Sequence, residues 1–319
     1  MAKAEQIKAL IKSHLTNESE RFKTIALQVA ADEAKRGHVV LAREIREIVD
    51  NKPDQKRVKV VSISHDLADL VVEGPRIEVW SSFVGRTDLK SKIDRIITEF
   101  HQSEKLMKHG MTNRRKILLT GPPGTGKTMS ASILAERTKL PFYVVQIDRL
   151  VTKYLGETNA KLRQIFSMIR ERPGIYLFDE FDAIGAQRTL DNEVGEMRRV
   201  LNALLKFIEE DESRSLIVAA TNNLISLDNA LFRRFDDIIH YENPVKDEII
   251  SLIKNRTHVF LGKFSLDVVA KHALGLSHAE ITQACDDAIK DAILSDKSKV
   301  TQRKLVQMLS DRKVAYQTV

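Results

Sequence analysis

The chain has 319 residues, of which 43% are hydrophobic and 30% are charged, which is enough for two or three domains with apolar cores and a solvated, helix-rich surface. The net charge of +7 reflects 51 basic and 44 acidic residues interspersed along the chain, and aromatic residues make up only 6%, so we expect no nucleic-acid partner. The single Cys285 excludes an internal disulfide, and the nine histidines lack metal-ligand spacing, so we expect no zinc. Neither a signal peptide nor an apolar run of transmembrane length occurs, so we expect a cytoplasmic protein without a membrane partner.

Residues 1–51 carry three amphipathic patterns typical of helices, which we expect to form a small bundle. The apolar stripes are Ile7, Leu10, Ile11 and Leu15; Phe22, Ile25, Ala26 and Val29; and Leu41, Ile45, Ile48 and Val49. Asn17 and Glu20 predict a capping box at the start of the second helix, and Gly37 fits the position after its end. The bundle has no catalytic constellation, so two interpretations stay open: a packing appendage, or a module that recognises a partner or substrate.

A predicted linker separates this bundle from a larger domain. Residues 52–76 contain Pro53, Pro75 and a charged run, with room for one short strand at 58–63. In residues 77–243, short apolar runs alternate with helical patterns, which predicts a parallel sheet with helices on both faces. The five strands are expected at 116–120, 142–146, 175–178, 216–220 and 238–241.

The run Gly121-Pro122-Pro123-Gly124-Thr125-Gly126-Lys127-Thr128 lies between the first of these strands and a helix predicted to reach Thr138. It matches the phosphate-loop pattern GxxxxGK[ST]. Its glycines let the backbone wrap an anion, Lys127 would reach the β- and γ-phosphates, and the Thr128 hydroxyl would bind Mg²⁺. The sequence therefore predicts a nucleoside-triphosphate site, and the residues expected to bind the nucleotide are Pro122, Pro123, Gly124, Thr125, Gly126, Lys127, Thr128 and Met129.

After the second strand, the segment 152–157 places Lys153, Tyr154 and Leu155 before a glycine. A lone tyrosine in such a place usually covers the core. The alternative is an exposed finger that lines a central channel. Both interpretations stay open from the residues alone.

Polar residues follow two other predicted strands at their carboxyl ends, where an α/β fold places its chemistry. Asp179 and Glu180 follow the run 175–178, about 55 residues after the phosphate loop, where Asp179 would hold the Mg²⁺ shell and Glu180 would polarise the attacking water. Asn222 follows the run 216–220 and could hydrogen-bond the γ-phosphate or the water, although an Asx turn is the default for such a residue.

Arg233 and Arg234 lie between apolar anchors, about a dozen residues after Asn222. Paired arginines in such a place usually form surface ion pairs. If subunits assemble into a ring, however, this segment can face the ATP of a neighbour, and an arginine supplied in trans can be worth ~10³–10⁵ in rate.

Residues 244–319 are predicted to be consecutive helices that form a lid. Asn243-Pro244 marks the start of the first helix, and Ser277 with Glu280 predicts a capping box that opens a later one. His278 lies inside that box, where an imidazole could contact nucleotide or be merely solvated; its role stays open.

The order GPPGTGKT, KYLGET, IYLFDEFDAIGAQR, AATNN and LFRRFDDI resembles the AAA ATPases of the AAA+ superfamily, especially the single-ring members, over residues 78–295. The resemblance implies that 121–128 is Walker A, that Asp179 and Glu180 are Walker B, and that Asn222 is sensor 1. It further implies that Arg233 and Arg234 are arginine fingers and that Lys153, Tyr154 and Leu155 belong to pore loop 1. It also implies a second pore loop between 188 and 196, and adenine contacts from the backbone of 82–85. Relatives commonly have glycine where this chain has His278.

The expected fold is therefore an α/β P-loop NTPase with a five-stranded parallel sheet, a C-terminal helical lid at 244–319 and an N-terminal helical bundle. The expected function, by resemblance, is Mg²⁺- and ATP-dependent remodelling or translocation of a protein client by a homo-oligomeric ring, most simply a hexamer. The alternative is an ATP-switched regulatory subunit of an effector such as a protease, without threading. A nucleic-acid remodeller of clamp-loader type fits less well, because KYLG resembles a protein-threading pore loop and no basic tract occurs.

Overall fold

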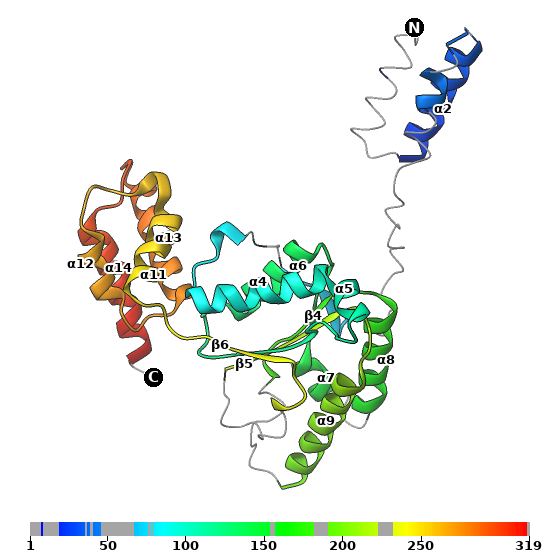
Figure 1. Cartoon of the computed structure of the whole chain (residues 1–319). Helices are drawn as coiled ribbons and strands as arrows, with labels where there is room; N and C mark the ends of the chain where they lie inside the picture. The colour runs from blue at the N-terminus through cyan, green and yellow to red at the C-terminus, as the bar shows by residue number, and fades with distance from the viewer. Residues whose placement is uncertain are drawn as a thin grey trace. The chain divides into compact units, whose positions relative to one another are not determined.

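The computed structural model describes residues 8, 19–35, 37–38, 41–45, 67–75, 78, 80–153, 157–181, 191–222 and 232–317 (Figure 1). The chain divides into two compact units, residues 1–62 and 63–319. Within the described residues, no helix is long and apolar enough to cross a membrane.

The N-terminal unit contains helix α2, Ser19–Lys35, and a helical segment at 41–45. Ala26, Val29 and Ala30 of α2 are buried together with Ala42, as expected for amphipathic helices that pack on one another. Gly37 follows α2 with a φ of +90°, the left-handed conformation that favours glycine at a helix end. The first predicted helix and the strand suggested at 58–63 lie outside the described residues, apart from Lys8.

The second unit is built on a six-stranded sheet with the order β1-β3-β4-β5-β2-β6. The strands are β1 Val71–Glu73, β2 Lys116–Thr120, β3 Phe142–Val145, β4 Ile175–Phe178, β5 Leu216–Thr221 and β6 Asp237–His240. The five predicted strands are present and parallel. The expectation of only five strands was wrong, because β1 adds an antiparallel edge by pairing with β3, inside the segment predicted to be a linker. Its three residues carry no periodic pattern, and only the pairing makes them a strand.

Helices cover both faces of the sheet (Figure 1). On one face lie α4 Thr87–His101, α5 Ser103–Lys108 and α6 Lys127–Thr138; on the other lie α7 Ile147–Lys153, α8 Thr158–Glu171 and α9 Asp191–Glu210. Neighbouring strand residues alternate between two cores. Ile117 packs with the first helix layer and Leu118 with the second. This burial on both faces explains why the strands are continuous apolar runs.

The C-terminal lid has a core of its own that includes the buried Cys285. Its elements are α11 Lys246–Thr257, η3 His258–Phe260, α12 Leu266–Ala273, α13 His278–Leu294 and α14 Gln302–Gln317. The first helix begins two residues after Pro244, because Val245 is extended and donates its N–H to the Glu248 carboxylate at 2.8 Å. The capping box predicted before α13 is present: Ser277 N–H donates to Glu280, and Glu280 N–H donates to the Ser277 hydroxyl.

Candidate functional site

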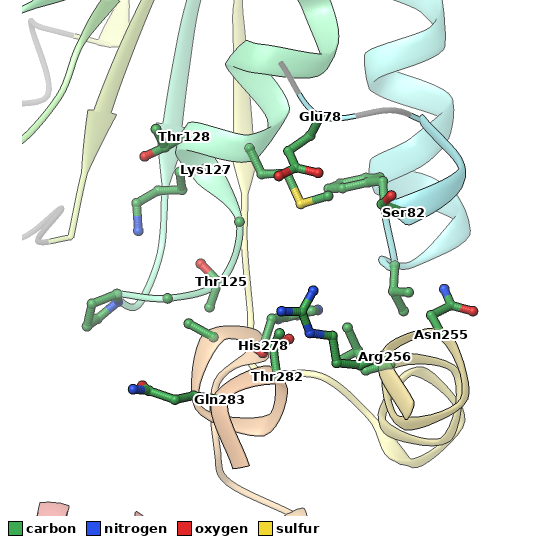
Figure 2. A pocket seen from close by; sticks show the side chains of 18 of the residues that line it. Glu78, Ser82, Thr125, Lys127, Thr128, Asn255, Arg256, His278, Thr282 and Gln283 are labelled. Atoms are coloured by element: carbon green, nitrogen blue, oxygen red, sulfur yellow. Dashed lines mark hydrogen bonds between the residues drawn. The ribbon is translucent and has the colours of Figure 1, made fainter. Parts of the chain in front are cut away.

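A cavity of about 960 Å³ lies between the large subdomain and lid helices α11 and α13 (Figure 2). It falls in the size range of pockets that hold small molecules and cofactors. Seven of the eight predicted nucleotide-binding residues line it: Pro123, Gly124, Thr125, Gly126, Lys127, Thr128 and Met129. Pro122 does not line it; its carbonyl instead accepts hydrogen bonds from Thr125 and Lys127.

The phosphate loop holds its shape through close packing and its own hydrogen bonds. A Cβ on Gly121 would lie 2.2 Å from the Tyr241 carbonyl oxygen, so only glycine fits there. The Lys127 ammonium donates to the carbonyls of Gly121 and Pro122 at 2.7 and 2.8 Å. Helix α6 begins at Lys127 after Gly126, which provides no side-chain cap. The first N–H groups of α6 and the Lys127 ammonium together make this loop an anion site.

Tyr241, which follows β6, holds the two elements on either side of the phosphate loop. Its N–H donates to the Thr120 carbonyl at 2.7 Å, and its buried hydroxyl donates to Ser130 on α6 at 2.6 Å. Burial raises the pKa of the Tyr241 hydroxyl well above its usual range. The neutral tyrosine therefore connects the end of β6 to β2 and α6, the two elements that flank the phosphate loop.

The pair Thr128 and Asp179 forms the oxygen cluster beside the loop. The Thr128 hydroxyl donates to Asp179 Oδ2 at 2.9 Å, and Asp179 Oδ1 accepts the Glu180 N–H at 2.9 Å. Hydroxyl and carboxylate oxygens suit a hard cation such as Mg²⁺. Among the described residues, no group of three or more His, Cys, Asp and Glu side chains could hold a metal. A cation here would therefore need further oxygens from phosphate or water.

Glu180 and Asn222 line the same cavity from the ends of β4 and β5. Glu180 has a φ of +52°, in the left-handed region that is uncommon for a side chain other than glycine. This backbone turns the chain sharply after Asp179. Asn222 follows Thr221, which is paired in register with Thr120 just before the phosphate loop. Parallel pairing thus brings the predicted Walker B and sensor 1 residues to the loop.

The two predicted arginine fingers do not join this cavity. Arg233 is exposed, and Arg234 forms an ion pair with Glu209 of α9 at 2.8 Å. Neither lines the cavity of its own chain. Lys153 is the last residue of α7, and the predicted pore-loop residues Tyr154 and Leu155 lie outside the described residues. Of the second pore loop predicted between 188 and 196, residues 188–190 also lie outside them, whereas 191–196 belong to helix α9.

Lid residues form one side of the cavity, and the sequence motifs predicted only part of that side. Its contributors include Leu252, Asn255, Arg256, His278, Thr282, Gln283 and Asp286. Arg256 of α11 and Asp286 of α13 form a two-bond ion pair, with Nη2 and Oδ2 2.7 Å apart. The hydrogen bond to Asp286 raises the pKa of the Arg256 guanidinium. Only His278 carried a sequence signal, as a departure from the family pattern; the others are ordinary positions on amphipathic helices. Of the predicted segment 82–85, Ser82, Phe83 and Val84 line the cavity.

Comparisons with known proteins agree with this geometry. Residues 117–243 match the family described as "ATPase family associated with various cellular activities (AAA)". The chain is 33% identical over 324 residues to an uncharacterized AAA family ATPase, y4kL, from Sinorhizobium fredii (strain NBRC 101917 / NGR234), covering 98% of this chain and 96% of that protein. The fold resembles the crystal structure of the FIGL-1 AAA domain, with a TM-score of 0.61 and 22% identity over 79% of this chain and 92% of the other. The chain belongs to the AAA ATPase family.

Proposed function

We propose that this chain is a Mg²⁺-dependent ATPase that works as a ring, most simply a hexamer, to remodel or translocate a protein client in the cytoplasm. The observation that carries the ATPase is the contact between Thr128 and Asp179 at 2.9 Å, beside a phosphate loop of the required shape. The loop connects β2 to α6, Thr128 lies in the first turn of α6, and Asp179 follows β4, so elements of one sheet support the site.

The site residues divide the work of hydrolysis between them. Lys127, which bonds to loop carbonyls, would exchange those acceptors for phosphate oxygens without leaving the loop. Thr128 and Asp179 would hold the Mg²⁺, which neutralises phosphate charge when it is bound. Glu180 would accept the proton of the attacking water, and Asn222 would orient that water or the γ-phosphate.

Arg233 and Arg234 support the ring part of the proposal by their position. Neither lines the cavity of its own chain, while Arg233 is exposed at the segment that leads into β6. We therefore assign them to the nucleotide of the neighbouring subunit, where a guanidinium would stabilise charge that develops on the γ-phosphate.

The client-handling part rests on the sequence of the segment after α7. Lys153, Tyr154 and Leu155 would grip an extended polypeptide. The N-terminal unit, with its buried Ala26, Val29 and Ala42, would recognise a partner or client. The competing role is an ATP-switched regulator of an effector, which needs the nucleotide site but not the pore residues.

The test compares Glu180→Gln with wild type, and Glu136→Gln serves as a control on helix α6, where Glu136 forms an i,i+3 ion pair with Lys139 and does not line the cavity. We expect Glu180→Gln to lose about 10²-fold or more of ATP turnover while it still binds ATP, since the amide cannot accept a proton. Mass photometry with ATP and Mg²⁺ should show a ring of about six subunits. Wild-type turnover in Glu180→Gln would overturn the assigned chemistry, and a monomer in every condition would overturn the ring. A stable ring that leaves clients untouched would favour the regulator.

A further inference from the structure

His278 occupies a fixed place against the phosphate loop. It is the first residue of α13, between the capping residues Ser277 and Glu280. The next residue, Ala279, donates its N–H to the Gly124 carbonyl at 3.0 Å. The fit is tight, because a Cβ on Gly124 would lie 2.7 Å from the Ser277 hydroxyl. The backbone that carries the imidazole is therefore held against the phosphate loop by contacts that do not involve the ring.

The two ring nitrogens of the partly buried His278 are covered without a protein partner among the described residues. Within the part of the chain that the structure describes, Nδ1 and Nε2 of His278 have neither solvent exposure nor a hydrogen bond. Burial lowers the pKa of the imidazole to about 4, and the partial positive charge at the N-terminus of α13 acts in the same direction. The ring is thus neutral at physiological pH, with one donor and one acceptor available. Buried polar atoms almost always have partners, so two in one ring point to a missing ligand.

The surroundings of His278 indicate which part of a ligand would reach it. His278 lines the same cavity as the phosphate loop, and Figure 2 shows His278 and Arg256 reaching in from the lid, with Lys127 and Thr128 farther along the loop beyond Thr125. If the phosphates lie on Lys127 and Thr128, the nucleoside half extends towards the lid and Ser82. Figure 2 shows Ser82 of the large subdomain on the side of the cavity away from Lys127.

We propose that His278 is a specificity-determining residue that hydrogen-bonds the nucleoside, through its ribose hydroxyls or its base edge, and thereby couples lid position to occupancy of the site. The inference rests on the proposed nucleotide binding and adds to it a side-chain contact from the lid. A buried ring without partners opposes folding and favours binding. Stability without nucleotide and affinity should therefore respond in opposite directions when the ring is replaced.

The experiment measures ADP binding by calorimetry and thermal unfolding without nucleotide, on the full chain. His278→Leu keeps an apolar side chain of similar size but makes no hydrogen bond, whereas His278→Asn keeps a donor and an acceptor. His272→Leu, on the exposed side of α12, is the matched control. We expect about tenfold weaker ADP binding in His278→Leu with an equal or higher Tm, partial recovery of affinity in His278→Asn, and wild-type binding in His272→Leu.

Two further ligands identify the contacted group. Loss of the tenfold difference with 2′-deoxyADP would assign the contact to the ribose, and loss with IDP, which lacks the 6-amino group, would assign it to the base edge. Wild-type ADP affinity in His278→Leu would overturn the inference while leaving the proposed function intact. A lower Tm with weaker binding in both substitutions at 278 would also overturn it, in favour of a structural role. Absence of ADP binding by the wild-type chain would instead refute the proposed function itself.

Discussion

The two sides of the cavity are built in different ways. On the phosphate side, a continuous run of eight residues makes the loop, and the Thr125 hydroxyl and the Lys127 ammonium donate to carbonyls within it. On the lid side, single residues from α11 and α13 meet only because the lid folds, and the His278 ring nitrogens have no partner within the described residues. The phosphate loop is thus held by hydrogen bonds within one short segment, whereas the lid side depends on how α11 and α13 pack.

The largest expected effect on activity comes from a substitution on the phosphate side of the cavity. Lys127→Ala removes the only ammonium that reaches the loop carbonyls of Gly121 and Pro122 among the described contacts. We expect ATP turnover to fall by about 10²–10³-fold, because charge on the phosphates loses its nearest compensation. Steady-state ATPase assays check this, with Lys108→Ala on α5 as the control. Turnover within threefold of wild type would contradict the assignment of this loop to phosphate.

An intermediate effect is expected where the two sides touch. Gly124 and Gly110 have nearly equal φ values of +73° and +72°, but a Cβ on Gly124 would meet Ser277 and Ala279, whereas a Cβ on Gly110 would meet nothing within 4 Å. Both alanine substitutions carry the same backbone strain, about 1 kcal/mol. Only Gly124→Ala also pushes the lid from the loop.

We therefore expect Gly110→Ala to lower stability slightly with unchanged ADP affinity, and Gly124→Ala to weaken ADP binding by about tenfold or more, since the steric overlap displaces the lid residues. Urea denaturation and calorimetry measure the two quantities. Equal ADP affinities in the two variants would mean that the contact between loop and lid does not matter for binding.

A further effect concerns pH and belongs to the lid side alone. In the unfolded chain His278 takes up a proton near its usual pKa of about 6.5, but in the folded chain burial lowers the pKa to about 4. The unfolded state therefore binds more protons in this window. The free energy of unfolding should fall as pH drops from about 6.5 to about 4. Urea denaturation at several pH values should show a shallower loss in His278→Leu than in wild type, and identical slopes would show that the ring is not buried as described.

The sequence by itself determined the elements whose signal is local. The inner strands β3, β4, β5 and β2 are largely apolar because they are buried on both faces, and the capping box at Ser277 and Glu280 needs only neighbouring residues. The phosphate loop is local for the same reason, because its glycines, Lys127 and Thr128 act within a single strand-turn-helix unit.

Only the tertiary structure decided the rest. Residues Val71–Glu73 form strand β1 because they pair with β3. The segment has no periodic pattern from which a strand could be predicted. The lid residues of the cavity could not be predicted from the sequence, because Leu252, Arg256 and Gln283 lie on ordinary amphipathic helices. They line one cavity only because α11 and α13 pack together. The unpartnered state of His278 is likewise a property of its surroundings, since burial and hydrogen bonding depend on what folding brings near the ring.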